Sequence, residues 1–506
     1  MCYLNIVGGD SIMKELSKLV ESISDAKTQG DLHISITSIT ADSREIEKGS
    51  LFICLEGAHV DGHTFVDKAI AAGAKALLVS KPVDVPADIA VIMVPDTRIG
   101  MQELVPAFYE YPASKMRMIG VTGTNGKTTT SHIIGHVLRE QGYKVGIIGT
   151  VHILINDVSY PIHNTTPDVA DLQKILSQMV EEGVTHCVME VSSHALELGR
   201  VAGIEFDNAI FTNLTQDHLD FHKTVENYLE AKCKLFELVS ASNIQKLPKG
   251  ATINIDDKYG QRVVEKTAVD TITYSTEGKG RMNAHDVHMT SKTSDFKLSF
   301  EGTTYDVHMR LSGLFNVYNT MAAIGACVTE GLSIPTILNA LENFSTVPGR
   351  FELIEEGQPF AVVVDYAHTP DGLENILQTA QEIVEKDIIV VFGCGGDRDA
   401  TKRPIMGAIA AKYADKIFVT SDNPRTEDPQ TIVEQVAQGV IDNLRPGTEY
   451  LVEVDRRTAI NKAIAVAGEG DVILIAGKGH EDYQILKDKT IHFDDREEAR
   501  LALRGR

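Results

Sequence analysis

Short apolar runs alternate along this chain with stretches in which apolar residues recur at helical spacing. The apolar runs suit buried strands and cover residues 34–39, 50–55, 76–79, 90–94, 116–121, 144–150, 186–192, 208–214, 361–365, 388–393, 416–420, 450–454 and 471–477. The stretches between them, such as 65–72 and 169–182, are typical of amphipathic helices. This alternation predicts an α/β fold in which mostly parallel sheets are joined by crossover helices.

Two breaks in the pattern divide the chain into three expected domains. Tyr111-Pro-Ala-Ser114 suits a linker, and Val347-Pro-Gly-Arg350 interrupts the pattern again. We therefore predict domains over residues 1–113, 114–346 and 347–506, which agrees with about three domains for a chain of this length. The central domain should hold a mostly parallel sheet, and the C-terminal domain a second, Rossmann-like open α/β sheet. Ligands of such sheets bind at the carboxyl ends of the strands.

Residues 120–130 constrain the chemistry most tightly, because they read Gly-Val-Thr-Gly-Thr-Asn-Gly-Lys-Thr-Thr-Thr between an apolar run and a helical stretch. Such a turn predicts a phosphate-binding loop, in which backbone N–H groups and the helix N-terminus cradle phosphate oxygens. Lys127 would neutralise β/γ-phosphate charge, and the Thr128 hydroxyl would bind Mg²⁺. The expected ATP contacts in this loop are Gly123, Thr124, Asn125, Gly126, Lys127, Thr128 and Thr129. The strict motif has glycine where this chain has Val121, so a plain turn is the competing interpretation.

Composition narrows the function classes. The chain has 48 basic and 71 acidic residues, and its net charge of −23 disfavours nonspecific binding to nucleic acid or anionic membranes. No apolar run approaches the ~18 residues of a membrane span, and no secretory signal is evident. The six cysteines include no C-x-x-C pair, which suits reduced thiols. We expect a cytoplasmic, monomeric enzyme that acts on small molecules and binds neither nucleic acid nor membrane.

Acidic and histidine side chains follow two of the predicted strands. Glu190 ends an apolar run, where a carboxylate suits an Mg²⁺ ligand or a water-positioning group, and a helix-capping carboxylate is the alternative. Asp217, His218, Asp220 and His222 follow the next run. Taken alone, these four residues fit a zinc site or a solvated helix N-terminus equally well. Their occurrence with a phosphate loop favours a magnesium–nucleotide site.

Lys232 is expected to point inward from a helix. The residues that share its helix face are apolar or aromatic, namely Tyr228, Leu229, Leu235 and Phe236. Lys234 instead follows Glu230 by four residues, the spacing of an exposed ion pair. Burial of an ammonium is costly, so the pKa of Lys232 should fall. The neutral amine can then react with CO₂ to give a carbamate that holds a second Mg²⁺, whereas the alternative is a lysine that extends to solvent.

These motifs together resemble those of the Mur ligases, which build the cytoplasmic peptidoglycan precursor. Gly-Thr-Asn-Gly-Lys-Thr-Thr, Glu-Val-Ser-Ser-His, Thr-Asn-Leu-x-x-Asp-His-Leu-Asp and Ala-Lys-x-x-Leu-Phe occur in the family order, and the resemblance covers essentially the whole chain. Within the family, the chain is most similar to ligases that add a diamino acid to UDP-N-acetylmuramoyl-L-Ala-D-Glu. The segments that carry this likeness are Asp42-Ser-Arg44, Asn164-Thr-Thr166, Asp365-Tyr-Ala-His-Thr-Pro370, Gly393-Cys-Gly-Gly-Asp-Arg398, Asp422-Asn-Pro-Arg425 and Gly477-Lys-Gly-His-Glu481.

The resemblance implies a role for each domain. The N-terminal domain would bind the UDP-sugar through Ser43 and the Ala58-His-Val60 loop, and the central domain would bind ATP. Many relatives carry a glutamine that is Leu198 here. The residues expected around the muramoyl peptide are Asn164, Thr165, Thr166, Ser192 and Arg200. The adenosine side of ATP would contact Asn316, Arg350 and Asp365, and the amino-acid pocket in the C-terminal domain would contain Arg398, Asp422, Asn423, Pro424, Arg425, Gly477 and Glu481.

The resemblance also implies meso-diaminopimelate as the added amino acid. Diaminopimelate differs from lysine by a carboxylate at its far end, and Arg425 supplies a planar cation suited to bidentate carboxylate binding. Lysine-adding relatives usually lack that arginine, and Glu481 would receive the distal ammonium. The competing interpretation is that Arg425 pairs with Glu427, and ligation of L-lysine is the alternative function.

The implied reaction is an ATP-dependent amide ligation through an acyl phosphate and ADP. The expected catalytic residues are Lys127, Glu190, His218 and Lys232. Thr128 and Glu190 would bind one Mg²⁺, while His218 and the carbamylated Lys232 would bind another. Closure of the C-terminal domain would assemble the site. The rival interpretations are a folate-polyglutamate ligase and a non-catalytic nucleotide-binding module.

Overall fold

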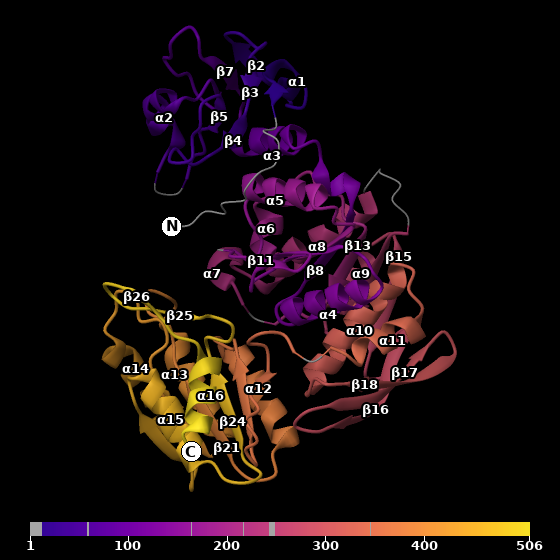
Figure 1. Cartoon of the computed structure of the whole chain (residues 1–506), viewed down its shortest axis with the longest axis vertical. Coiled ribbons are helices and arrows are strands. Elements are labelled where there is room, and N and C mark those ends of the chain that lie inside the picture. Colours follow the sequence, from indigo (N-terminus) through magenta and orange to yellow (C-terminus); the bar gives the residue numbers. More distant parts are fainter. Residues whose placement is uncertain (1–12, 58–59, 163, 216, 242–247, 345) are drawn as a thin grey trace.

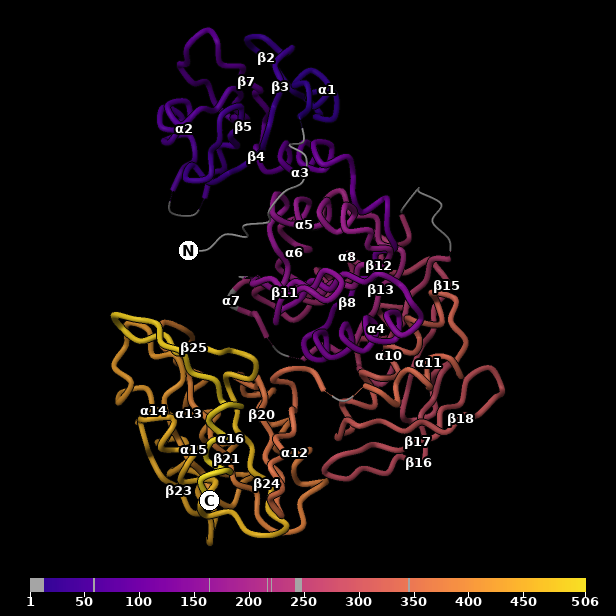
Figure 2. Tube along the Cα trace, viewed as in Figure 1, coloured from indigo at the N-terminus to yellow at the C-terminus, as the bar shows by residue number. Residues whose placement is uncertain are grey.

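The computed structural model describes residues 13–57, 60–162, 164–215, 217–241, 248–344 and 346–506. Three α/β units follow one another along the chain, with the N-terminal unit at the top of Figure 1, the central unit in the middle and the C-terminal unit at the lower left. Figure 2 traces the same path from indigo to yellow. The predicted fold class, α/β with parallel-rich central and C-terminal sheets, is confirmed.

The N-terminal unit is a five-stranded sheet with flanking helices. The strand order is β2-β7-β6-β5-β4, and only β2 is antiparallel to its neighbour. The elements are β1 (Lys14–Glu15), α1 (Leu16–Val20), β2 (Lys27–Gln29), β3 (Ser35–Ile36), β4 (Ser38–Thr40), β5 (Ser50–Ile53), α2 (Val66–Ala72), β6 (Ala76–Val79), β7 (Ala90–Met93) and α3 (Thr97–Phe108). Most of the segment expected as a linker, 111–114, is a 3-10 turn in which Pro112 and Ala113 are buried.

The central unit contains an eleven-stranded sheet in the order β11-β10-β9-β12-β8-β13-β14-β15-β16-β17-β18. Its elements are β8 (Arg117–Thr122), α4 (Lys127–Glu140), β9 (Val145–Ile148), β10 (Ile153–Ile155), β11 (Val158–Tyr160), α5 (Val169–Glu181), β12 (His186–Glu190), α6 (Ser193–Glu197), β13 (Asn208–Phe211), α7 (Leu219–His222), α8 (Val225–Ala241), β14 (Gly250–Asn254), α9 (Gly260–Glu265), β15 (Asp270–Ser275), β16 (Met282–Met289), β17 (Ser294–Phe300), β18 (Thr303–Met309), α10 (Leu314–Thr329) and α11 (Ile334–Leu341). The strands from β9 to β16 in this order are parallel, and antiparallel strands extend both edges.

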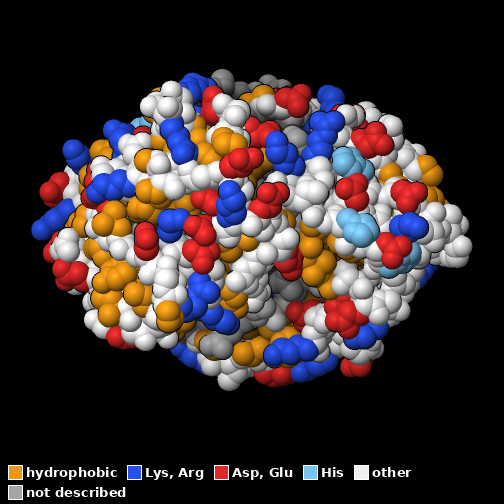
Figure 3. Space-filling model, turned by 90° about the horizontal axis from the view of Figure 1, so that it is seen from below, with side chains coloured by type: hydrophobic (Ala, Val, Ile, Leu, Met, Phe, Trp, Pro, Cys, Tyr) orange, Lys and Arg blue, Asp and Glu red, His pale blue; other side chains and the backbone are white. Residues whose placement is uncertain are grey.

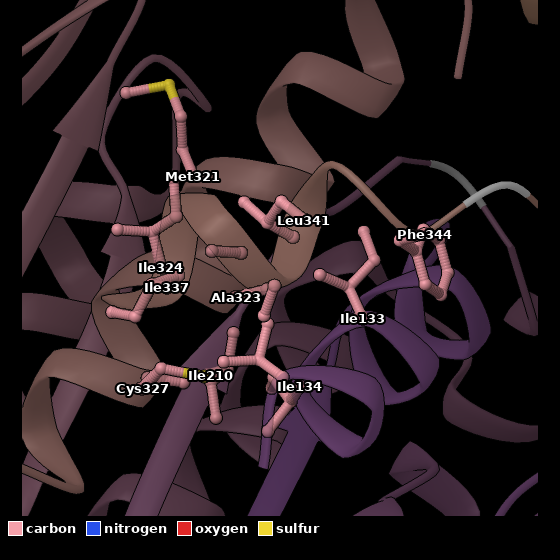
Figure 4. Packing of buried hydrophobic residues seen from close by; sticks show 14 of the residues in the cluster. Ile133, Ile134, Ile210, Met321, Ala323, Ile324, Cys327, Ile337, Leu341 and Phe344 are labelled. Atoms are coloured by element: carbon pink, nitrogen blue, oxygen red, sulfur yellow. The ribbon is translucent and has the colours of Figure 1, made fainter. Parts of the chain in front are cut away.

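Alternating side chains of the central sheet form two hydrophobic cores. Ile119 of β8 faces the core beneath α4, α10 and α11, while Met118 faces the opposite core beneath α5 and α8. Figure 4 shows Ile133 of α4 packed near Leu341 of α11. Ile119 and Val121 of β8 and Ile133 and Ile134 of α4 belong to this same core, so burial of apolar surface stabilises the packing of α4 on β8.

The C-terminal unit is a six-stranded sheet in the order β19-β20-β24-β21-β22-β23, parallel except for β19. Its elements are β19 (Glu352–Leu353), β20 (Ala361–Asp365), α12 (Pro370–Ile383), β21 (Ile388–Phe392), α13 (Lys402–Tyr413), β22 (Lys416–Val419), α14 (Pro429–Asp442), β23 (Glu449–Val452), α15 (Arg456–Val466), β24 (Val472–Ala476), β25 (Tyr483–Ile485), β26 (Thr490–His492) and α16 (Asp495–Arg504). The carboxyl end of β20 faces the central unit, because residues 365–369 share a cavity with the phosphate loop.

The surface is mixed in charge. On the face seen in Figure 3, acidic and basic side chains are interspersed. Within the described ranges, no helix combines the length and apolar character needed to cross a bilayer. The five cysteines of that part of the chain are buried and form no disulfide.

Candidate active site

The phosphate loop joins the end of β8 to the start of α4, so the predicted strand, turn and helix are observed. Gly126 has a φ of 85°, and a Cβ at this position would lie 2.3 Å from Asn319 Oδ1. Glycine is therefore required at this position. Lys127 Nζ crosses the loop and donates to the carbonyl oxygens of Gly123 at 2.9 Å and Thr124 at 2.8 Å.

Lys232 of α8 lies beneath the same loop and is 1% exposed. Its Nζ donates to the Gly123 carbonyl at 2.8 Å and lies 4.4 Å from the centre of the Tyr228 ring. Burial, followed by the nearby Lys127 ammonium, holds the pKa of Lys232 well below its usual value. The inward orientation predicted from helix spacing is confirmed.

The ion pair expected between Glu230 and Lys234 is wrong. Lys234 pairs with Glu197 of α6 at 2.6 Å, and Glu230 accepts from Arg262 at 3.0 Å and from Lys266 at 2.9 Å. Pairs at (i, i+4) spacing contribute only about 0.2–0.5 kcal/mol in a helix. Charged partners from the elements packed beside α8 therefore decide how these side chains pair.

Glu190 is fully buried at the end of β12. Its two carboxylate oxygens accept from the backbone N–H and the hydroxyl of Thr150, each at 2.9 Å. The helix-capping alternative is wrong, because Ser192 caps the following helix α6. The carboxylate is thus held in one orientation at the wall of the cavity that Thr128 also lines.

A cavity of about 620 Å³ lies between the central and C-terminal units. Predicted site residues that line it are Thr124, Asn125, Gly126, Lys127, Thr128, Thr129, Thr165, Glu190, Ser192, His218, Arg350 and Asp365. Asp371, in the first turn of α12, joins the two units because its Oδ2 accepts from Asn125 Nδ2 at 2.7 Å and from Thr215 Oγ1 at 2.9 Å. The phosphate loop is therefore held directly against the C-terminal unit.

Of the three residues predicted for the adenosine side of ATP, Arg350 and Asp365 line the cavity and Asn316 does not. Arg350 Nη2 donates to Thr128 Oγ1 at 3.2 Å, and its guanidinium lies 4.6 Å from the centre of the Tyr366 ring. Asp365 is held by the N–H groups of the turns around it. Asn316 is buried away from the cavity and donates to the Ser312 carbonyl, whereas Asn319, one helical turn later, lines the cavity.

A second polar cluster occupies the carboxyl ends of β22 and β24. Asn423 Nδ2 donates to Glu481 Oε2 at 2.9 Å, and Lys478 Nζ donates to Asn423 Oδ1 at 3.1 Å. Burial raises the pKa of the Glu481 carboxyl. Gly477 has a φ of 122°, and a Cβ there would lie 2.6 Å from Asp422 Oδ2. These residues, predicted from sequence motifs, form one compact polar cluster.

Arg425 extends from this cluster without the acidic partner that the competing interpretation assigned to it. Its Nη1 donates to the carbonyl of Gly396 at 2.9 Å, and Glu427 instead pairs with Arg403 at 2.9 Å. Pro424, just before Arg425, is buried. Arg398 is exposed on the neighbouring loop. The proposed pairing of Arg425 with Glu427 is therefore wrong.

Known proteins share this architecture along the chain. A model of the Mur ligase family catalytic domain matches residues 35–120, the Mur ligase middle domain matches 121–327, and the Mur ligase glutamate ligase domain matches 349–479. A UDP-N-acetylmuramoyl-L-alanyl-D-glutamate–2,6-diaminopimelate ligase from Bacillus cereus is 46% identical over 492 residues, 97% of this chain and 99% of that protein. The chain belongs to the Mur ligase family.

Two further relatives agree with this assignment. A ligase of the same description from Geobacillus thermodenitrificans is 49% identical over 471 residues, which span 93% of this Mur ligase and 95% of that protein. A solved structure, also described as a UDP-N-acetylmuramoyl-L-alanyl-D-glutamate–2,6-diaminopimelate ligase, superposes with a TM-score of 0.70 at 32% identity and covers 97% of this chain and 99% of that chain. The predicted family and enzyme class are thereby confirmed.

The residues expected around the muramoyl peptide gather at one edge of the cavity of this Mur ligase. Thr166 Oγ1 donates to the Glu190 carbonyl at 2.9 Å and accepts from the Ser192 N–H at 3.1 Å, and Arg200 Nη1 donates to the Thr166 carbonyl at 3.2 Å. Thr165 contacts Thr150 at 3.1 Å. Asn164 is exposed nearby. These hydrogen bonds link the predicted peptide site to the predicted metal site.

The remaining predicted residues are those of the UDP-sugar site in the N-terminal unit and the histidines that follow β13. Ser43 lies in the turn after β4 of the N-terminal unit, and Ala58 and His59 fall outside the described residues. His218 has a φ of 53°, and its ring stacks edge-on against His194, 4.8 Å between centres. The buried His222 contacts Ser193 Oγ at 2.9 Å.

Within the described ranges, ligand atoms of three histidine, cysteine or acidic side chains come close together only at Glu56, Asp61 and His63. Lys81 already pairs with the two carboxylates of this group.

Sequence reasoning missed three residues that shape the sites. Asn319 lines the cavity, Asp371 accepts hydrogen bonds from the phosphate loop and Thr215, and Gln102 of α3 donates to the Leu198 carbonyl at 3.1 Å. Gln102 places an amide beside the position where many relatives carry a glutamine side chain. Lys478 lies inside a recognised motif, so its position was visible, but its burial was not. No sequence pattern indicated a role for Gln102, because Gln102 and its partner Leu198 are 96 residues apart in the sequence.

Proposed function

We propose that this Mur ligase uses ATP to join meso-diaminopimelate to the D-Glu γ-carboxylate of UDP-N-acetylmuramoyl-L-Ala-D-Glu. One observation carries the proposal: a chain 46–49% identical to diaminopimelate ligases over most of its length also has Arg425 in contact with Asn423, which in turn contacts Glu481. A guanidinium suits the distal carboxylate of diaminopimelate, and a carboxylate suits its distal ammonium. Neither the lysine-adding nor the folate alternative accounts for Arg425.

Each domain has a part in this proposal. Residues 1–113 would bind the UDP-sugar, 114–346 ATP and the muramoyl peptide, and 347–506 the incoming amino acid. The cavity that both later domains line supports this division. We propose a monomer, because one chain carries the phosphate loop and the amino-acid pocket. We place the reaction in the cytoplasm, where ATP is available and where the unpaired cysteines stay reduced.

The first step transfers the γ-phosphoryl group. A γ-carboxylate oxygen of the substrate forms a bond to the γ-phosphorus while the bond to the ADP oxygen breaks, and this gives an acyl phosphate. Lys127 would move from the carbonyls of Gly123 and Thr124 to the phosphate oxygens, and Arg350, now on Thr128, lies close enough to share this charge. Positioning and electrostatics account for the catalysis, since no covalent enzyme intermediate forms.

The oxygen donors around the loop fit Mg²⁺. Thr128 and Glu190 line the same cavity and supply the hydroxyl and carboxylate oxygens that this cation prefers. His218 lines the same cavity, and the buried Lys232, as a carbamate, would supply two further oxygens beneath the loop. When bound, Mg²⁺ would neutralise negative charge on the phosphate oxygens. The low pKa of Lys232 supports carbamate formation, because only the neutral amine reacts with CO₂.

The second step forms the amide. The diaminopimelate amine attacks the acyl carbon, the carbon–oxygen bond to phosphate breaks, and the nitrogen loses a proton. Arg425, Asn423 and Glu481 would hold the far end of the amino acid, so that its reactive amine faces the cavity. Asp371 would keep the C-terminal unit docked on the phosphate loop during this step.

ADP release from the purified full-length protein tests the proposal. The assay contains ATP, Mg²⁺ and UDP-N-acetylmuramoyl-L-Ala-D-Glu with meso-diaminopimelate, L-lysine or L-ornithine. We expect rapid release only with diaminopimelate, and none when the muramoyl dipeptide is omitted. Preference for L-lysine would contradict the amino-acid assignment. Slow hydrolysis that ignores both co-substrates would favour the non-catalytic alternative.

A further inference from the structure

Lys478 follows Gly477 after the end of β24, in the polar cluster that the proposed function assigns to the added amino acid, and it is completely buried. Its Nζ is 3.1 Å from Asn423 Oδ1, 3.5 Å from Glu481 Oε2 and 3.9 Å from Asp422 Oδ1. The centre of the Tyr483 ring lies 5.7 Å away. A buried ammonium is tolerated only when polar partners surround it, so these contacts fix the position of Nζ.

Lys478 also determines how the Asn423 amide is oriented. An ammonium has only donors, and the Ile485 N–H donates to the same Asn423 Oδ1 at 2.9 Å. With two donors on its oxygen, the amide must turn its nitrogen toward Glu481, where Nδ2 donates at 2.9 Å. An amide nitrogen carries two hydrogens, so the second can bind a carboxylate of the incoming amino acid.

Negative and positive charges are matched around Lys478. Asp422 and Glu481 contribute two carboxylates, and Lys478 and Arg425 contribute two cations. The buried Arg456 also acts on both carboxylates, but its charge is matched by its ion pair with Asp495. An amino acid whose far end carries both an ammonium and a carboxylate adds no net charge to this group. L-lysine adds one positive charge beside a buried ammonium and offers no carboxylate to Arg425. Repulsion of this kind discriminates between ligands as effectively as attraction.

We propose that Lys478 is a positioning residue that selects an amino acid with a carboxylate beside its distal ammonium and disfavours L-lysine. It acts through Asn423, whose amide it turns toward the ligand, and through its own buried charge. This inference rests on the proposed function, because that function assigns the pocket to the added amino acid.

Steady-state ADP release with Lys478→Gln tests the proposal, using meso-diaminopimelate and L-lysine in parallel. We expect the KM for diaminopimelate to rise about tenfold with a much smaller change in kcat, because binding at the far end of the ligand is lost. The ratio of kcat/KM for diaminopimelate to that for L-lysine should fall about tenfold or more, since L-lysine loses a repulsion. If Lys478 had a purely structural role, kcat/KM would fall equally for diaminopimelate and for L-lysine. An unchanged ratio of the two kcat/KM values would therefore overturn the proposal.

Matched variants separate the possible outcomes. Lys487→Gln, which alters an exposed lysine between β25 and β26, should keep the ratio of the unmodified protein. Lys478→Arg, which keeps the positive charge, should preserve most of the selectivity. If Lys478→Gln does not fold, Asn423→Asp serves in its place, because it removes the amide donor and offsets the Lys478 charge with little change in shape. An unchanged ratio in Asn423→Asp then overturns the proposal.

The activity of the unmodified protein distinguishes failure of the proposed function from failure of the role assigned to Lys478. If it releases no ADP with either amino acid, the proposed function fails. If it prefers diaminopimelate and the Lys478 and Asn423 variants keep that preference, only the role of Lys478 fails.

Discussion

Lys127 and Lys232 donate to the same acceptor, the carbonyl oxygen of Gly123, at 2.9 and 2.8 Å. Two ammonium groups that share one oxygen repel each other, and burial lowers the pKa of both. Conversion of the Lys232 amine to a carbamate would place a negative charge beside Lys127 and turn this repulsion into attraction. The shared carbonyl thus supplies a physical reason why Lys232, and not the exposed Lys234, is the residue we expect to be carbamylated.

Loss of Lys232 should remove most of the activity. We expect Lys232→Ala to lower kcat by roughly 10²–10³-fold, a loss typical of removing one electrostatic group from a transition state. Lys234→Ala, two residues along the same helix, should have little effect because its side chain pairs at the surface with Glu197. ADP release measures both variants. Near-normal turnover in Lys232→Ala would remove this lysine from the mechanism.

Carbamylation should also make the unmodified enzyme depend on bicarbonate. Activity in CO₂-depleted buffer is expected to fall and to return when bicarbonate is added. The pKa of Lys232 is held well below its usual value, so more of the reactive neutral amine is present at a given pH than in an exposed lysine, and this fraction decreases as the pH falls. Recovery by bicarbonate should therefore be weaker at acidic pH. Activity that ignores bicarbonate at every pH would contradict carbamylation.

Arg425→Ala should impair recognition of diaminopimelate specifically. The loss of a bidentate, charge-assisted contact should lower kcat/KM for diaminopimelate by roughly 100-fold. The slow reaction with L-lysine provides the internal control, since L-lysine has no distal carboxylate and its rate should not fall. Equal losses for the two amino acids would indicate that Arg425 supports the fold of the pocket and does not bind the ligand.

Asp371→Ala should weaken the docking of the C-terminal unit on the phosphate loop. The variant removes the acceptor of the Asn125 and Thr215 hydrogen bonds, and a loss of about 1–2 kcal/mol would lower kcat/KM for ATP about tenfold. Asp488→Ala, at an exposed position of the same unit, should behave like the unmodified protein. Unchanged ATP kinetics in Asp371→Ala would show that these bonds do not hold the active arrangement.

Asp495→Ala should destabilise the C-terminal unit. Arg456 and Asp495 form an ion pair at 2.6 Å in which both side chains are fully buried, and Arg456 also donates to the Ala476 carbonyl at the end of β24. Removing one partner of a buried pair costs about 3–5 kcal/mol. Urea unfolding should show this loss, whereas Arg457→Ala, which breaks a more exposed pair with Glu498, should cost about 1 kcal/mol or less. Similar costs for the two variants would contradict this prediction.

The sequence predicted best the features that depend on local spacing. The strand, turn and helix around Gly126 follow from a continuous apolar run, glycine chemistry and helical periodicity, and the burial of Lys232 follows from the residues on its helix face. Strands β16 and β18, which flank β17 and run antiparallel to it, were not predicted, because many of their side chains are exposed and no continuous apolar run marks them.

Features that depend on contacts between distant elements were beyond sequence reasoning. Glu230 and Lys234 have the spacing of an ion pair, yet neighbouring elements supply other partners for both. Asn316 and Asn319 lie one helical turn apart, and only the packing of α10 against α4 decides which of them lines the cavity. The burial of Lys478 likewise arises where the segments after β22 and β24 meet.

The central claim is that ATP activates the D-Glu γ-carboxylate as an acyl phosphate before diaminopimelate attacks it. Substrate labelled with a heavy oxygen isotope in that carboxylate tests this claim most directly, with mass spectrometry of both products. The account predicts a UDP-muramoyl tripeptide and inorganic phosphate that carries one labelled oxygen. Tripeptide formed together with unlabelled phosphate would contradict it.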